Sequence, residues 1–189
     1  MRPLPTAFFR RPASVVAADL LGATIVSTAG GRRTAGLIVE IEAYLGRDDP
    51  ASHAYRGRRH SGNASLYEPP GTWYVYRSYG VHWCSNLVCG GPAAGGAVLL
   101  RAIAPLEGLE LMRKRRGGVA DRVLADGPGK LCQAMGITRA LDGLAMRTSP
   151  VIVGRTPRRP AGERLVTPRI GITKATDWPL RFVLLLGAQ

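Results

Sequence analysis

Short segments with the composition of β-strands follow one another along this chain, and glycine- or proline-containing turns separate them. The strand-like segments are consecutive more often than they alternate with helical patterns, which favours antiparallel pairing over βαβ units. The sequence therefore predicts an α+β fold. We expect a single domain, residues 1–189, built around a curved, mainly antiparallel sheet that resembles an open barrel, with short flanking helices.

The expected elements are short. Strands are predicted over residues 23–27, 35–44, 73–79, 81–88, 97–103, 151–153, 169–173 and 181–186. Helices are predicted over residues 15–21, 106–115 and 130–135, with Ser14 capping the first one and Gly22 ending it. Residues 1–12, rich in proline and arginine, are expected to form an extended N-terminal arm. Residues 45–72 indicate a long loop, and a loop of this length in a compact domain is usually functional or mobile.

The net charge points to a polyanionic partner. The chain has 26 Lys and Arg against 13 Asp and Glu, which gives a formal charge of +13. The sequence pI is about 10.8, a value typical of nucleic-acid-binding domains. Arginine supplies 23 of the 26 cations and suits bidentate contacts with phosphate. Charge alone also fits a basic protein whose arginines are simply scattered over its surface.

The sequence fits neither a membrane protein nor a disulfide-stabilised protein. No window approaches the roughly 18 uninterrupted apolar residues of a membrane span, and no apolar signal region follows the first arginines. We therefore expect a cytoplasmic protein with no membrane partner. Cys84, Cys89 and Cys132 lack the spacing of zinc knuckles and are too few for a disulfide scaffold, so reduced, mostly buried thiols are expected.

Two carboxylates in one predicted strand are the first candidate for chemistry. Glu40 and Glu42 lie two residues apart, so they share a strand face with Tyr44. This pair suits general-base or metal chemistry, but the spacing alone favours the solvated face of an amphipathic strand. An acidic group near a bound polyanion lowers affinity, and it is tolerated more readily if it does chemistry.

Aromatic residues and a histidine form the next candidates. His53 precedes Arg56 and Arg58 in the long loop, where it either faces a phosphate or base or is simply exposed. Strand alternation places Tyr74 and Tyr76 on one face, as part of the core or as a stacking surface. Tyr79 is then exposed at a hairpin tip, where an aromatic side chain can wedge between bases.

A glycine-rich turn precedes one of the predicted helices. Gly127, Pro128, Gly129 and Lys130 open this helix, and helix N-termini bind phosphate. The spacing differs from that of a P-loop, and a simple turn is the alternative interpretation.

Taken together, these segments resemble the alkyladenine (3-methyladenine) DNA glycosylases of the alkyl-purine type. The matching stretches occur in the family's order across residues 8–186, and the ordered set is far more specific than any one of them. They read LIVEIEAYLG (37–46), ASH (51–53), PGTWYVY (70–76), YG (79–80), SN (85–86), VLLRA (98–102), PLEG (105–108) and GPGKLC (127–132).

The resemblance implies a monofunctional enzyme of base-excision repair. Such an enzyme flips a damaged purine out of duplex DNA, hydrolyses its N-glycosyl bond with water and leaves an abasic site. The implied partner is double-stranded DNA containing damaged purines, and no metal or other cofactor is implied. The chain is expected to act as a monomer.

The resemblance also assigns residues to roles. Glu42 matches the general base that positions the water, and Arg101 matches the residue that helps to place the water and the backbone. Asn86 matches the residue that obstructs the 2-amino group of normal guanine, and Tyr79 the residue that fills the gap in the duplex. The implied base pocket comprises Tyr44, His53, Tyr76, Asn86 and Leu99. The candidates for contacts with the DNA backbone are Arg56, Arg58, Arg77 and Lys130.

One stretch departs from the family's pattern. Where the family often carries Thr-Pro-Arg-Asn after the loop histidine, this chain reads RHSGNASL at residues 59–66. The DNA contacts of this loop and the preferred lesions (3-methyladenine, 7-methylguanine, hypoxanthine or ethenoadenine) therefore stay open, as does the role of Glu40.

Two other functions remain as alternatives. The first is a non-catalytic lesion- or nucleic-acid-binding module with the same basic surface, in which Glu42→Gln would change nothing. The second is a metal-dependent nuclease that uses Glu40, Glu42 and Asp48, whose strand cleavage a chelator would abolish.

Overall fold

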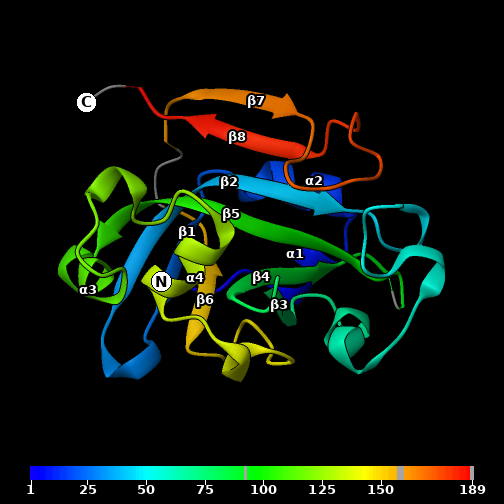
Figure 1. Cartoon of the computed structure of the whole chain (residues 1–189), viewed down its shortest axis with the longest axis horizontal. Coiled ribbons are helices and arrows are strands. Elements are labelled where there is room, and N and C mark those ends of the chain that lie inside the picture. Colours follow the sequence, from blue (N-terminus) through cyan, green and yellow to red (C-terminus); the bar gives the residue numbers. More distant parts are fainter. Residues whose placement is uncertain (92, 157–159, 188–189) are drawn as a thin grey trace.

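A single antiparallel sheet organises the protein (Figure 1). The computed structural model describes residues 1–91, 93–156 and 160–187. Eight strands pair in the order β3-β4-β5-β2-β1-β6, with β8 added to β2 and β7 added to β8. Every pairing between the described strands is antiparallel, and the sheet does not close. The predicted α+β fold with an open, antiparallel sheet is therefore confirmed.

The elements have the following bounds. The strands are β1 Thr24–Ser27, β2 Thr34–Tyr44, β3 Trp73–Ser78, β4 His82–Cys89, β5 Gly96–Glu107, β6 Val151–Gly154, β7 Glu163–Thr167 and β8 Arg181–Leu185. The α-helices are α1 Thr6–Phe9, α2 Ala13–Leu20, α3 Leu109–Arg115 and α4 Pro128–Met135. Short 3₁₀ helices cover Ala29–Gly31, Gly46–Asp48, Tyr55–Gly57, Ser61–Tyr67, Asp121–Val123 and Arg139–Leu141.

The strand β2 is the centre of the sheet. Strand β5 pairs along one of its edges, while β1 and β8 share the other, β1 near its start and β8 at residues 40–42. Both edges of β2 are therefore paired with neighbouring strands at residues 40–42.

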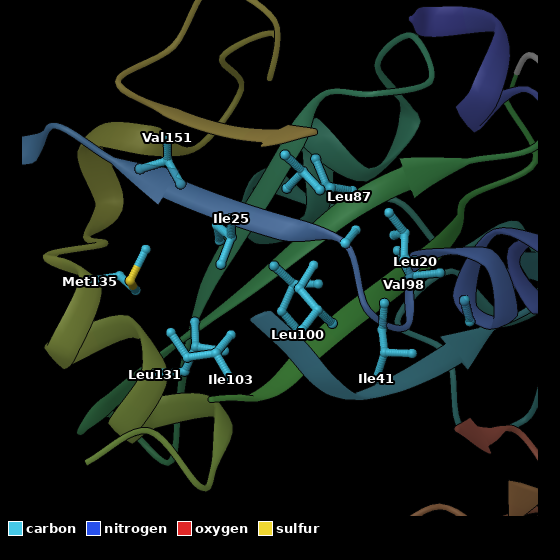
Figure 2. Close-up of a cluster of buried hydrophobic side chains, with 14 of the residues drawn as sticks. Leu20, Ile25, Ile41, Leu87, Val98, Leu100, Ile103, Leu131, Met135 and Val151 are labelled. Carbon is cyan, nitrogen blue, oxygen red and sulfur yellow. The ribbon is translucent and has the colours of Figure 1, made fainter. Parts of the chain in front are cut away.

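The main core joins the sheet to α2 and α4 (Figure 2). Leu20 of α2 and Leu131 and Met135 of α4 are fully buried, together with Ile41 and Leu100 of the central strands. Burying one such aliphatic side chain contributes roughly 1.5–3 kcal/mol. A smaller cluster of Ala54, Leu66, Tyr74, Val88 and Ala97 fixes the long loop of residues 45–72 to the sheet.

Three predicted helix features are corrected. The segment 1–12 is not wholly extended, because Thr6–Phe9 forms α1. Helix α2 begins at Ala13 with Pro12 at its N-cap, and Ser14 lies in its first turn instead of capping it. Helix α3 begins at Leu109 rather than at residue 106, because β5 continues along β2 until Glu107 pairs with Ala35.

One predicted strand is wrong. Residues 169–173 have no strand conformation, and the strand that pairs with β8 is the earlier β7. The physical reason is that Ile170 donates its backbone N–H to the Glu42 carboxylate instead of to a neighbouring strand. The predicted final strand is confirmed as β8.

The cysteines match the expectation from their spacing. Cys84, Cys89 and Cys132 are free and buried. Burial raises the pKa of the Cys132 thiol to about 12, which keeps it protonated at neutral pH. Among the described residues, no helix is both long enough and apolar enough to cross a membrane.

Candidate active site

The register of four strands lines up the predicted site residues. Tyr74 of β3 lies opposite Asn86 of β4, Asn86 opposite Leu99 of β5, and Leu99 opposite Glu42 of β2. Directly opposed residues point to the same face of a sheet, so these four side chains form a row across it. Alternation along the strands adds neighbours two positions away on the same face, among them Tyr76, Cys84, Ala97, Arg101 and Tyr44.

Glu42 is fully buried and held on both carboxylate oxygens. The Tyr44 hydroxyl donates to Oε2 at 2.9 Å, and the backbone N–H of Ile170 donates to Oε1 at 2.8 Å. The Arg101 guanidinium lies 3.3 Å from Oε1. Hence Glu42 is not on a solvated strand face, although the i, i+2 spacing alone favoured that interpretation.

Arg101 links the two carboxylates of the predicted pair. Its Nε donates to Glu40 at 2.7 Å, and Arg181 of β8 donates to the same Glu40 oxygen at 2.7 Å. The β2–β5 ladder shifts register on both sides of Glu40, and such bulges re-aim side chains near sites. Burial would lower the pKa of Arg101, but the carboxylates of Glu42 and Glu40 outweigh burial and raise it.

A cavity of about 690 Å³ opens beside Glu42. Its lining includes every residue of the predicted base pocket, Tyr44, His53, Tyr76, Asn86 and Leu99, together with Arg101. The three residues that contact the Glu42 carboxylate, Tyr44, Arg101 and Ile170, all line it, so the carboxylate lies directly behind the cavity wall. The volume is within the range of about 300–1,000 Å³ usual for small-ligand sites.

Aromatic rings form one wall of this cavity. Tyr74 stacks on Tyr76 with ring centroids 5.3 Å apart, and the His53 ring stands edge-on to Tyr76 at 4.6 Å. The His53 Nδ1 atom shares a hydrogen bond of 2.7 Å with the Tyr74 hydroxyl. The Asn86 amide donates to the Tyr74 carbonyl at 3.1 Å, which fixes its orientation in the cavity.

The cavity wall carries neutral polar groups. Burial raises the pKa values of Tyr44, Tyr74 and Tyr76, so their hydroxyls stay protonated. His53 is exposed overall, yet burial of its ring against the tyrosines lowers its pKa below 6.5, and nearby His60 lowers it further. A neutral imidazole and three neutral phenols therefore face the space.

The divergent loop, residues 59–66, is tied to the site by Asn63. This residue is fully buried, and its amide donates to the carbonyls of His53 and Arg58, at 3.0 Å each. Its carbonyl accepts the His60 N–H at 2.9 Å. Asn63 thus positions the loop that carries His53.

Tyr79 lies at the tip of the β3–β4 hairpin. It is 92% exposed and has a positive φ of 49°, and Gly80 follows with a φ of 69°. The turn closes with a hydrogen bond from the Val81 N–H to the Ser78 carbonyl. Tyr79 also lines the mouth of the 690 Å³ cavity, so an exposed ring stands next to an internal aromatic wall.

The four candidates for contacts with the DNA backbone lie in different parts of the structure. Arg56 and Arg58 line a second cavity of about 480 Å³, which shares His53 with the first. Arg77 lines the first cavity, with its guanidinium 4.8 Å from the ring centroid of Trp83. Lys130, in the first turn of α4, forms an ion pair of 2.9 Å with Asp126.

Sequence reasoning missed several residues of the site. Tyr74 and Cys84 line the cavity but were not assigned to it, although strand alternation put Tyr74 beside Tyr76. Lys174 lines both cavities, and Ile170 and Arg169 belong to the segment between β7 and β8, which lies next to the end of β2 in Figure 1. Residues 169–173 of that segment were predicted as a strand, so no signal linked them to Glu42.

The carboxylates of the nuclease hypothesis lie in different settings. Glu40 is bound by two arginines, Glu42 by the contacts given above, and Asp48 is exposed. Within residues 1–91, 93–156 and 160–187, no group of three or more His, Cys, Asp or Glu is arranged to hold a metal ion. The geometry gives this hypothesis no specific support.

Comparison with known proteins agrees with the site. The sequence profile of the methylpurine-DNA glycosylase family matches residues 7–186. The chain belongs to this family. The resemblance inferred from its motifs is thereby confirmed.

Curated relatives cover nearly the whole chain. A protein of Methanoculleus marisnigri is 51% identical over 185 residues, which cover 96% of this chain and 94% of the relative. A protein of Granulibacter bethesdensis is 48% identical over 181 residues, 95% of this chain and 82% of the relative. Each carries 3-methyladenine DNA glycosylase as a provisional name.

Proposed function

We propose that this protein is a monofunctional DNA glycosylase that extrudes alkylated or deaminated purines from duplex DNA and hydrolyses their N-glycosyl bond. The observation that carries the proposal is the buried Glu42 carboxylate directly behind the wall of an aromatic cavity. Family membership and the names of the relatives support the same reaction class. The proposed partner is double-stranded DNA, bound by a monomer.

The cavity suits a purine that has left the base stack. A base inside a duplex is out of reach, and its extrusion costs a few kcal/mol. The rings of Tyr44, Tyr76 and His53 offer stacking faces and edges for it. A purine made cationic by methylation gains a further roughly 0.5–2 kcal/mol on electron-rich faces, and the neutral state of His53 avoids charge repulsion.

The reaction needs a water activated at the cavity wall. In the proposed step the water oxygen forms a bond to C1′ of the sugar, and one water proton passes to the Glu42 carboxylate. The C1′–N9 bond breaks, and its electron pair leaves with the purine. In a methylated purine this pair neutralises the positive charge of the base, and in a neutral purine such as hypoxanthine the departing anion takes up a proton from water. A positioned general base contributes on the order of 10²–10⁴ to the rate.

DNA contacts would come from the rim of the cavity. Tyr79 would fill the space left in the duplex, and Arg56, Arg58 and Arg77 would contact phosphates. Lys174 joins this set because it lines both cavities. Lys130 is a weaker candidate, because Asp126 already neutralises it. Such contacts fix the position of the protein on the duplex without reading its sequence.

The decisive experiment uses a labelled duplex with a single hypoxanthine or 7-methylguanine, in the presence of a chelator and with alkali added after the reaction. The wild-type protein and Glu42→Gln are compared. Glu107→Gln is the matched control, because Glu107 is half exposed at the end of β5 and, among the residues that the structure describes, forms an ion pair only with Arg33. We expect strand breaks only after alkali, at equal rates in wild type and control, and a loss on the order of 10²–10⁴ in Glu42→Gln.

The alternatives give different outcomes. Tight binding of the lesion duplex without any alkali-dependent break would support the non-catalytic module. Breaks before alkali that the chelator abolishes would support a nuclease. Excision by Glu42→Gln at the wild-type rate would refute the role of Glu42 while leaving the reaction class in place.

A further inference from the structure

The buried ion pair between Arg169 and Asp49 is not assigned to any step of the reaction. We propose that this pair is a positioning device that holds the backbone N–H of Ile170 on the Glu42 carboxylate and thereby fixes the general base. The inference rests on the proposed function. It adds two residues to the machinery that no motif of the sequence pointed to.

The geometry of the pair is that of a bidentate clamp. Arg169 Nη1 and Nη2 donate to the two carboxylate oxygens of Asp49 at 2.5 Å and 2.9 Å, and both side chains are 0% exposed. The same carboxylate accepts the backbone N–H groups of Leu45 and Ala51, at 3.0 Å each. Four donors therefore fix Asp49, which leaves its position little freedom.

Arg169 in turn connects this carboxylate to the end of β2. Its Nη1 donates to the carbonyl of Ala43 at 3.1 Å, and its guanidinium carbon lies 4.7 Å from the centroid of the Tyr44 ring. Ala43 and Tyr44 directly follow Glu42 in the chain. Tyr44 is also the residue whose hydroxyl donates to Glu42. The clamp thus fixes the strand that carries the general base and one of its donors.

The clamp also fixes the second donor. Ile170 is the residue next to Arg169, and its N–H donates to Glu42 Oε1 at 2.8 Å. The segment from Ile170 to Lys174 lines the cavity and has no strand partner. Since no ladder holds this segment, the buried Arg169–Asp49 pair at the adjacent residue restrains the position of the Ile170 N–H.

A positioning role differs from a structural role in a measurable way. A device that acts only through Glu42 loses its effect once Glu42 no longer acts as a base, so the two substitutions are not additive. A pair that merely stabilises the fold lowers excision by the same factor with or without Glu42. A small misplacement of a catalytic group can cost about 10²-fold in rate.

The test is a set of single-turnover excision assays on a duplex with one 7-methylguanine, whose cationic base leaves readily enough to keep slow variants measurable. The proteins are wild type, Arg169→Lys, Asp49→Asn, Glu42→Gln and the double variant Glu42→Gln with Arg169→Lys. Arg113→Lys is the matched control, because Arg113 forms a bidentate ion pair with Asp121 on the surface of α3. Binding of the lesion duplex and thermal unfolding are measured in parallel, and excision is assayed below every melting transition.

We expect Arg169→Lys and Asp49→Asn to bind the duplex like wild type and to excise about 10²-fold more slowly. The double variant should be no slower than Glu42→Gln alone, and Arg113→Lys should match wild type. Asp49→Asn decides the question if Arg169→Lys does not fold. The inference would be overturned if Arg169→Lys and Asp49→Asn both excised at the wild-type rate. It would also be overturned if adding Arg169→Lys to Glu42→Gln slowed excision by the same factor as Arg169→Lys slows the wild-type protein. In both cases, excision by the wild-type protein would still support the proposed function. An inactive wild-type protein would overturn both.

Discussion

Among the side chains of the site, Tyr79 is the one whose substitution best tests DNA recognition without disturbing the fold. Tyr79 is 92% exposed at the tip of the β3–β4 hairpin, while the other aromatic residues of the cavity also pack against the fold. Replacing Tyr79 by alanine should therefore weaken the capture of an extruded base and leave the protein folded.

The two magnitudes follow from the geometry. The φ of 49° strains any residue other than glycine by about 1–2 kcal/mol, and alanine carries the same strain as tyrosine. The free energy of unfolding should thus change by no more than about 0.5 kcal/mol, as for other surface substitutions. A stacked aromatic ring contributes roughly 1–3 kcal/mol per base. At a factor of ten per about 1.4 kcal/mol, its loss lowers capture roughly 5- to 150-fold.

The assay compares excision of hypoxanthine from a duplex and from the same strand alone, with enzyme below saturation. Tyr79→Ala should lose roughly 5- to 150-fold on the duplex and less on the single strand, which has no stacked gap to fill. Tyr79→Phe keeps the ring and should retain the wild-type rate. Leu106→Ala, which removes an apolar side chain that is 56% exposed near the end of β5, controls for a general loss of apolar surface.

Two results would refute this reasoning. Equal excision by Tyr79→Ala and wild type on the duplex would exclude a wedge. An equal loss on both substrates would show that Tyr79 acts on the base inside the cavity and not on the gap in the duplex.

Three further expectations concern stability and charge. The pKa of His53 is lowered in the folded protein, so the unfolded chain binds a proton first as the pH falls through 6.5, and the folded state loses stability below that pH. The free energy of urea unfolding should therefore fall less between about pH 8 and pH 5 in His53→Gln than in the wild-type protein. In Gly46→Ala, the added Cβ would lie 2.0 Å from the Ala94 carbonyl oxygen at a φ of 82°, so its melting temperature should fall well below that of Gly57→Ala, where φ is 73° and the space is open. Arg56→Gln should reduce the slope of log affinity against log salt for duplex DNA by about 1, with little dependence on sequence.

Local signals predicted the parts of the fold that depend on neighbouring residues. The β3–β4 hairpin follows from strand alternation on either side of Gly80, and Tyr74 and Tyr76 share a face as the period of two requires. Helix α4 forms where a helix was predicted over residues 130–135, but it begins earlier, at Pro128, a residue that fits a first helical turn. These features need no information from distant parts of the chain.

Long-range contacts decided the features that the sequence did not predict. Residues 169–173 have a strand-like composition, but Arg169 is captured by a carboxylate 120 positions earlier, and the Ile170 N–H goes to Glu42. Glu42 was placed in the correct strand and on the correct face. Its burial arises because β5 and β8 flank it and the segment before β8 donates to it. Neither contact can be predicted from the local sequence pattern.

The same contacts explain how a cluster of carboxylates persists in a chain that attracts polyanions. Glu40 is bound by Arg101 and Arg181, and Asp49 by Arg169. Glu42, which shares Arg101 with Glu40, is enclosed behind the cavity wall, and the guanidinium beside it offsets its charge.

The cations at the rim of the cavity differ from the internal charged groups in their pairing. No carboxylate of the described residues forms an ion pair with Arg56, Arg58 or Lys174. Unpaired cations at a cavity mouth raise the local concentration of a polyanion, whereas paired internal charges largely cancel at a distance. Keeping the acidic groups of the site in arginine pairs therefore allows a carboxylate to serve as a base without repelling the phosphates that bring the substrate to it.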